Sequence, residues 1–187
     1  MLSTEGFGEV YSMEGGIHAW DGLTATGAPE AGMAWFPEKA SWPDLISLAW
    51  VLEDGSRRFY SELPSRVNDR DAGGLFGQLV LAEEHHQSAL SELYRKMTGA
   101  AAGPPARSGE DVMEGGVKVS EALAWVTGRS VTEVLELAVG LETNSYDLYI
   151  KMGRKMTDEH SKEVFSMLAS GEKDHLGRLV GLLEKKV

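Results

Sequence analysis

The tetrapeptides Glu83-Glu84-His85-His86 and Glu172-Lys173-Asp174-His175 share the spacing Glu-x-x-His. Residues three apart lie on one face of an α-helix, so the carboxylate and the imidazole of each motif can point at a common partner. One such motif is a weak signal, because charged pairs at this spacing occur on many exposed helices. Two of them, in related surroundings, are a stronger signal.

The two motifs lie 89 positions apart, and the same offset relates most of the chain to itself. It aligns glutamate with glutamate, tyrosine with tyrosine, and the expected helix starts with each other. The matches include Glu53 with Glu142, Tyr60 with Tyr149, Phe76 with Phe165, Leu79 with Leu168, and Ser41 with Ser130. Because these matches share one offset without a gap, the sequence indicates an internal duplication.

Apolar residues at helical spacing predict four helices in two related pairs. A Ser-x-x-acid pattern, typical of a capping box, starts the first helix at Ser41 and the third at Ser130. We expect the first helix to stop at Pro64. The second should open near residues 68–71, and the fourth near residues 157–159.

The second helix should end before Gly99, where a connection rich in glycine and proline begins. This connection covers residues 99–116 and is followed by a short helix around residues 120–126. A connection of this length lets the second and third helices run in the same direction on opposite sides of a bundle. The predicted fold is therefore all-α, a four-helix bundle with a long crossover between helices 2 and 3.

Six ionisable residues fall on the apolar faces of these helices. Ionised groups are rarely buried unless they are paired or bind a metal. Four clustered carboxylates repel one another, whereas two divalent cations would neutralise them and leave two imidazoles as neutral ligands. Carboxylate and imidazole together suit iron, manganese or zinc. The six residues are Glu53, Glu83, His86, Glu142, Glu172 and His175.

Composition excludes several other functions. The net charge of −11 argues against nucleic acid or an anionic membrane surface as the main partner. The absence of cysteine excludes disulfides, thiolate zinc sites, iron–sulfur clusters and a thiol nucleophile. No apolar run approaches the roughly 18 residues that span a bilayer. We therefore expect a cytoplasmic protein that binds no membrane.

With this pattern, residues 41–187 resemble the ferritin-like di-iron proteins and, among them, rubrerythrin. The resemblance implies a ferritin-like bundle with two iron ions, manganese or zinc being possible, and a homodimer. It implies that Glu83 and Glu172 bridge both ions, and that each histidine binds one ion. Its six implied ligands are Glu53, Glu83, His86, Glu142, Glu172 and His175.

One tyrosine lies two helical turns after the glutamate of the first helix, and another lies two turns after the glutamate of the third helix. Tyr60 and Tyr149 lie on the same faces as Glu53 and Glu142, and their hydroxyls can hydrogen-bond ligand carboxylates. The alternative is that both rings pack in the core and their hydroxyls bond elsewhere.

The chain departs from rubrerythrins at two points. Rubrerythrins usually carry a rubredoxin-like domain with four cysteines, so this chain would need a separate electron donor. They also usually carry an extra glutamate three residues after the equivalent of Glu142, where this chain has Ser145. That difference puts in doubt the movement of one iron that accompanies their peroxidase reaction.

Residues 1–38 resemble the C-terminal end of a rhodanese domain, through Gly6-Phe7, Val10-Tyr11, Gly15-Gly16-Ile17 and Ala19-Trp20. The rhodanese active-site loop with its nucleophilic cysteine is missing, so the resemblance does not support sulfur transfer. The alternative is a short, irregular N-terminal arm. The chain thus divides into this arm and a bundle domain over residues 39–187.

Two functions are consistent with these features. The first is an oxidoreductase that reduces hydrogen peroxide or dioxygen at a rubrerythrin-like site. The alternative is a non-catalytic iron-binding or sensor module linked to a sulfurtransferase. The sequence leaves open the native metal, the oxidant, the electron donor and whether Met1 is the true start.

Overall fold

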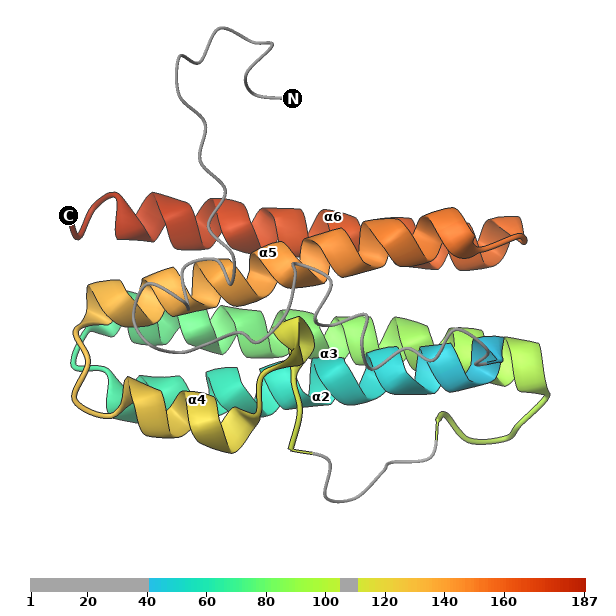
Figure 1. The fold of residues 1–187 in the computed structure, drawn as a ribbon, viewed down its shortest axis with the longest axis horizontal. Helices are drawn as coiled ribbons and strands as arrows, with labels where there is room; N and C mark the ends of the chain where they lie inside the picture. Colours follow the sequence, from blue (N-terminus) through green and yellow to red (C-terminus); the bar gives the residue numbers. More distant parts are fainter. Residues whose placement is uncertain (1–40, 105–110) are drawn as a thin grey trace, which may run out of the picture.

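The computed structural model describes residues 41–104 and 111–187, so the segment that resembles a rhodanese domain lies outside the described residues. All regular elements in the described parts are helices, and four long ones form a bundle (Figure 1). The prediction of an all-α bundle with a crossover is therefore confirmed. The elements are α2 (Trp42–Arg66), α3 (Arg70–Thr98), the 3-10 turn η3 (Glu114–Gly116), α4 (Val119–Val126), α5 (Val131–Lys155) and α6 (Glu159–Leu183).

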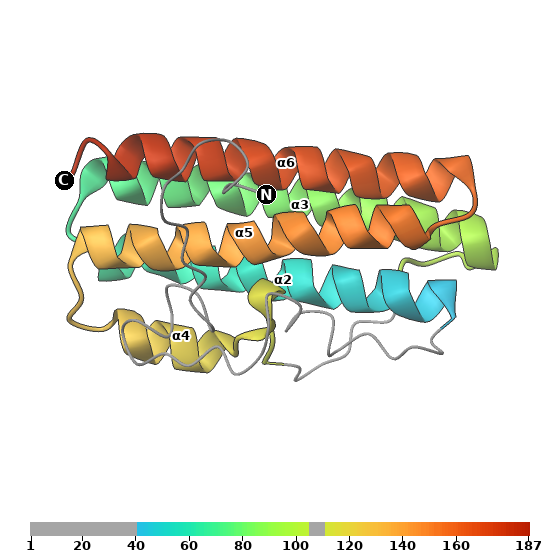
Figure 2. The same ribbon diagram turned by 45° about the horizontal axis from the view of Figure 1, so that its top comes forward.

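The bundle consists of two helix pairs, α2 with α3 and α5 with α6. The pairs meet where α3 packs on α6, and η3 contacts both α2 and α5. Helices α3 and α5 run in the same direction, as the crossover requires, and α4 lies outside the four long helices beside α2 (Figure 2). Among the described helices, none combines the length and apolar character needed to cross a membrane.

The helix starts reflect the duplication. Ser41 and Ser130 cap α2 and α5 with the same backbone angles, φ −68° and ψ 158°. In both capping boxes the serine side chain accepts from the third backbone N–H, and the acidic side chain at that position accepts from the serine N–H. Asp69 and Asp158 cap α3 and α6 through their carboxylates. The predicted starts are confirmed at all four helices.

The expected stop at Pro64 is wrong, because α2 continues to Arg66. Proline removes one backbone donor, but the Val67 N–H still donates to the Leu63 carbonyl at 3.0 Å. Leu63 is fully buried, so packing stabilises the last turn despite the lost hydrogen bond.

Two apolar clusters fill the bundle, and the polar residues lie between them along every long helix. In one cluster Tyr149 packs against Phe165, with ring centroids 6.1 Å apart. In the other, Tyr60 stacks on Phe76 at the same separation. The duplication thus produces two equivalent cores with a polar layer between them.

The crossover lies directly on the backbone of α2. A Cβ atom on Gly55 would stand 2.0 Å from the Val112 carbonyl oxygen and 2.7 Å from Met113 Cα. No side chain fits in that space, so glycine is required for this contact. Gly115, in η3, has a φ of +75°, which favours glycine for a different reason.

Gly55→Ala should therefore destabilise the protein by about 1–3 kcal/mol, since the crossover must move away from α2. Gly74→Ala is the matched control, because a Cβ at exposed Gly74 in α3 meets nothing within 4 Å. There the better helix propensity of alanine should give up to about 1 kcal/mol of stability. Urea unfolding of both variants checks the difference; equal midpoints would contradict the close contact.

Candidate metal centre

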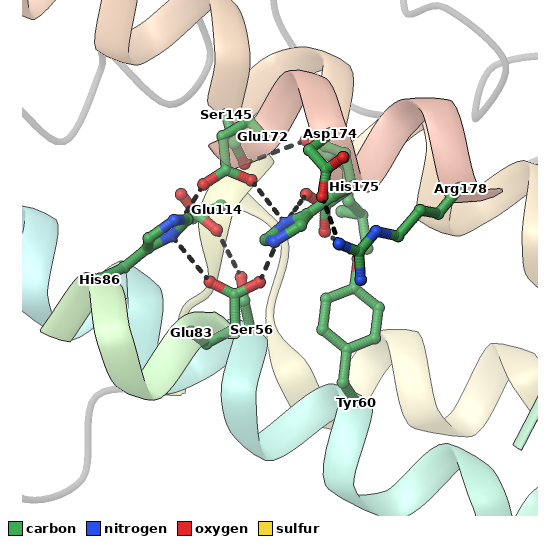
Figure 3. Close-up of polar contacts among 12 residues, drawn as sticks. Ser56, Tyr60, Glu83, His86, Glu114, Ser145, Glu172, Asp174, His175 and Arg178 are labelled. Carbon is green, nitrogen blue, oxygen red and sulfur yellow. Dashed lines mark hydrogen bonds and ion pairs between the residues drawn. The ribbon is translucent and has the colours of Figure 1, made fainter. Parts of the chain in front are cut away.

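The structure brings all six predicted residues together in the polar layer, and none is more than 4% exposed. Helices α2 and α5 each contribute one glutamate, while α3 and α6 each contribute a glutamate and a histidine. Figure 3 shows Glu83 beside both imidazole rings, those of His86 and His175. The residues are Glu53, Glu83, His86, Glu142, Glu172 and His175.

Three carboxylates converge on one nitrogen of His86. Its Nδ1 lies 3.2 Å from Glu53 Oε2, 3.3 Å from Glu83 Oε2 and 3.0 Å from Glu172 Oε1. An imidazole nitrogen carries at most one hydrogen, so it cannot satisfy three acceptors. Oxygen and nitrogen atoms gathered in this way are suited to a shared cation.

His175 has an equivalent environment. Its Nδ1 lies 2.9 Å from Glu142 Oε2, 3.2 Å from Glu172 Oε2 and 3.7 Å from Glu83 Oε1. Around each histidine, four potential ligand atoms lie within 4.8 Å of one another. Both groups include Glu83 and Glu172. The arrangement therefore suits two cations that share two carboxylates.

Unsatisfied oxygens support the same interpretation. Among the described residues, both carboxylate oxygens of Glu83 and one of Glu172 are buried without a hydrogen-bond partner. A buried carboxylate oxygen without a partner costs free energy unless a cation compensates it. The residues therefore fit a pair of metal ions.

The two tyrosines connect the halves of the bundle. The Tyr60 hydroxyl, from α2, donates to Glu142, and the Tyr149 hydroxyl, from α5, donates to Glu53. Burial, followed by the nearby carboxylates, raises the pKa of both tyrosines well above the usual value. Both hydroxyls therefore stay protonated and hold the glutamate of the opposite half.

Burial affects the four carboxylates unequally in the metal-free protein. Burial and the negative charges of its neighbours raise the pKa of Glu83 and of Glu172 well above the usual range. Burial also opposes ionisation of Glu53 and Glu142, but their histidine and tyrosine partners outweigh it and lower the pKa of both groups. Without metal, burial therefore favours the protonated form of the two shared carboxylates, whereas the histidine and tyrosine partners favour the ionised form of the two outer ones.

One further buried acid, Glu114 in η3, was not expected from the sequence. It is 1% exposed, and its Oε2 accepts a hydrogen bond from Ser56 Oγ at 2.9 Å. Burial and the charges of Glu53 and Glu142 raise its pKa to about 8. Glu114 lies in the crossover, where no helical period marks an inward position, and the glycines that follow it were interpreted only as breakers.

Ser145 occupies the position where the resemblance implies an extra glutamate. Its hydroxyl donates to the Leu141 carbonyl of its own helix at 3.1 Å. Ser56, its counterpart in the other half, instead donates to Glu114. The two halves of the centre therefore differ at this position.

An open pocket of about 830 Å³ between α3 and α6 is lined by both histidines. Gly171 lies in its wall, and a Cβ there would stand 2.3 Å from His86 Nε2. Its counterpart in the duplication, Ala82, also lines the pocket. Small residues on the two helices therefore leave room for the imidazoles and give small molecules a path to them.

Comparisons with known proteins concern the family and the fold. A family model described as rubrerythrin matches residues 44–183. A solved structure, of a hypothetical protein from Pyrococcus furiosus, is similar with a TM-score of 0.61 and 21% identity, covering 84% of this chain and 95% of that one. This similarity concerns the fold. A search of curated proteins found no match.

Gly171→Ala should weaken metal binding, because the added methyl group displaces the His86 ring from the centre. We expect a loss of about 10–100-fold in affinity, the range found when the support of a metal ligand is disturbed. Gly177→Ala on the same helix is the control, since a Cβ there meets nothing within 4 Å. Calorimetric titration with zinc compares them; identical affinities would show that the ring tolerates the methyl group.

The metal-free protein should lose stability as the pH rises from about 5 to about 8. The folded state raises the pKa of Glu83, Glu172 and both histidines, so their stabilisation is complete below the unfolded values and is lost as the pH rises through the folded ones. The lowered pKa of Glu53 and of Glu142 acts only below about 4.5.

Urea unfolding of the metal-free protein at several pH values measures this trend. The metal-loaded protein is the control, because metal replaces the protons and binds more tightly as the pH rises. A metal-free protein that gains stability over the same range would contradict the assigned protonation.

Proposed function

The chain belongs to the rubrerythrin family, and from that premise we propose that it is a di-iron carboxylate protein that reduces hydrogen peroxide or dioxygen. The observation that carries the proposal is the pair of four-residue groups that share Glu83 and Glu172. Shared carboxylates hold two ions close enough to act on one small molecule. A homodimer and a separate electron donor belong to the same proposal.

Charge balance supports two metal ions. Glu53, Glu83, Glu142 and Glu172 carry four negative charges when ionised, which two divalent ions neutralise while the imidazoles remain neutral. Carboxylate-rich sites with imidazole suit iron, with manganese and zinc as alternatives. Bound iron would supply the two electrons that peroxide reduction consumes.

The protein's own groups would position the ions and admit the oxidant. Tyr60 and Tyr149 restrain the outer carboxylates, and the shared carboxylates come from the two helices that also supply the histidines. The pocket between α3 and α6 is large enough for peroxide or dioxygen and reaches both imidazoles. The apolar clusters on either side keep water out of the remaining directions.

The test is anaerobic loading with ferrous iron, followed by rapid mixing with hydrogen peroxide or with air-saturated buffer. Near-ultraviolet absorption of the oxidised iron pair reports the reaction. We expect two irons per chain, fast oxidation by one of the oxidants, and repeated turnover when a reductant is supplied. Stoichiometric binding with slow oxidation would favour the iron-binding or sensor module instead.

Glu53→Ala should lower iron content and turnover together, the turnover by more than about 100-fold, because it removes a carboxylate of one ion. Glu62→Ala is the matched control on the same helix, since that side chain is 50% exposed and pairs with Arg66 on the surface. A Glu53→Ala protein that binds two irons and reduces peroxide like the unmodified chain would refute the assignment.

A further inference from the structure

Glu114 is a buried carboxylate that the six-residue site does not use. One oxygen, Oε2, accepts a hydrogen bond from Ser56, whereas Oε1 is buried without a hydrogen-bond partner among the described residues. The side chain is 1% exposed. An acid buried to this degree requires a partner, and one oxygen of this carboxylate has none in the described part of the chain.

The chain holds this carboxylate in place by contacts on both sides. Gly55 lets the backbone of Val112 and Met113 lie against α2, and Gly115 brings η3 within 3.3 Å of Leu141 and Asn144 side-chain atoms on α5, measured from an added Cβ. The Gly116 N–H donates to the Met113 carbonyl at 3.1 Å, which closes the turn. Glu114 thus enters the bundle between α2 and α5, at the level of the polar layer (Figure 3).

The hydrogen bond from Ser56 relates Glu114 to one half of the centre. Ser56 lies on α2 three residues after Glu53, so the two side chains lie on the same face of that helix. Ser145, the counterpart of Ser56 on α5, bonds to the carbonyl of its own helix instead. Glu114 is therefore held on the side of Glu53, which belongs to the group that contains His86.

A fifth carboxylate also changes the charge balance. Two divalent ions neutralise the four glutamates of the centre, and an ionised Glu114 would leave one negative charge in excess. An excess of this sign favours a more positively charged ion at the centre. It is a reason for an acid at this position, whereas a core that needed only packing would use an apolar residue.

From these observations we propose that Glu114 is an additional ligand for the ion held by Glu53 and His86, and that the Ser56 hydroxyl keeps its carboxylate in place when no metal is bound. The inference rests on the proposed metal pair and adds a seventh residue to it. It also makes the two ions unequal, because the crossover supplies this carboxylate to one half only.

Titration of the metal-free protein with cobalt(II) tests the proposal without any assay of activity. Heat and visible absorption report affinity and coordination. Glu114→Gln keeps the size of the side chain and an oxygen for Ser56, but removes the charge. We expect this substitution to lower the affinity for one of the two cobalt ions by about 10–100-fold and to change the cobalt spectrum. The other ion should bind with unchanged affinity.

Three further variants separate ligation from other roles. Ser56→Ala removes the hydrogen bond but leaves the carboxylate, so it should still bind two ions with the unmodified spectrum. Glu114→Asp keeps the charge but withdraws the carboxylate by one methylene group, so it should lose affinity as Glu114→Gln does. Glu121→Gln, at an exposed acid of the following helix α4, should change nothing. If Glu114→Asp binds cobalt normally, only charge matters and ligation is refuted.

The two histidines identify the ion. In a His86→Ala background the affected ion already lacks its imidazole, so adding Glu114→Gln should cost little further affinity for the remaining ion. In a His175→Ala background the added change should cost the full 10–100-fold. The reverse result would place Glu114 on the other ion and overturn the assignment.

Failure of the metal pair and failure of the role of Glu114 give different results in these titrations. If the unmodified chain takes up no cobalt and no iron, both fail. If it binds two ions and Glu114→Gln has the same affinities and spectrum, the di-iron proposal stands and the role of Glu114 is refuted.

Discussion

The burial of four carboxylates in one layer of a helical bundle is the constraint on which this structure depends. Like charges within a few ångströms of one another, away from water, repel strongly and cannot all ionise without a compensating cation. In the metal-free state protons and histidines compensate in part: burial and like charges raise the pKa of Glu83 and of Glu172, whereas the histidine partners lower the pKa of Glu53 and of Glu142. Two apolar clusters, one on each side, confine the charges to this layer.

The duplication explains how the layer is assembled. Each half supplies one helix with a glutamate and one helix with Glu-x-x-His, and neither half has enough ligands for two ions. Tyr60 binds the glutamate of the second half, and Tyr149 binds the glutamate of the first. The polar contacts at the centre therefore cross between halves, and they couple the packing of α2 to that of α5.

Most of the fold could be predicted, because the signals were local and repeated. Capping residues such as Ser41 and Ser130 act within one helical turn, and the polar residues stand out against regular apolar faces. The predicted helix end at Pro64 was wrong because tertiary packing stabilises the last turn of α2. The exchange of tyrosine partners depends on how the two pairs pack, which helical period alone does not determine. Glu114 was missed because its position follows from the path of the crossover, with no periodic neighbours.

The crossover breaks the symmetry that the duplication creates. Its described part contacts both α2 and α5 at η3, and a side chain there, such as Glu114, reaches the two equivalent halves unequally. Ser56 and Ser145 show the result: they correspond in sequence, yet Ser56 bonds to Glu114 and Ser145 bonds to the carbonyl of Leu141. Two groups of nearly identical residues thereby acquire different surroundings. A duplicated bundle can in this way keep a symmetric framework and still distinguish its two candidate metal positions.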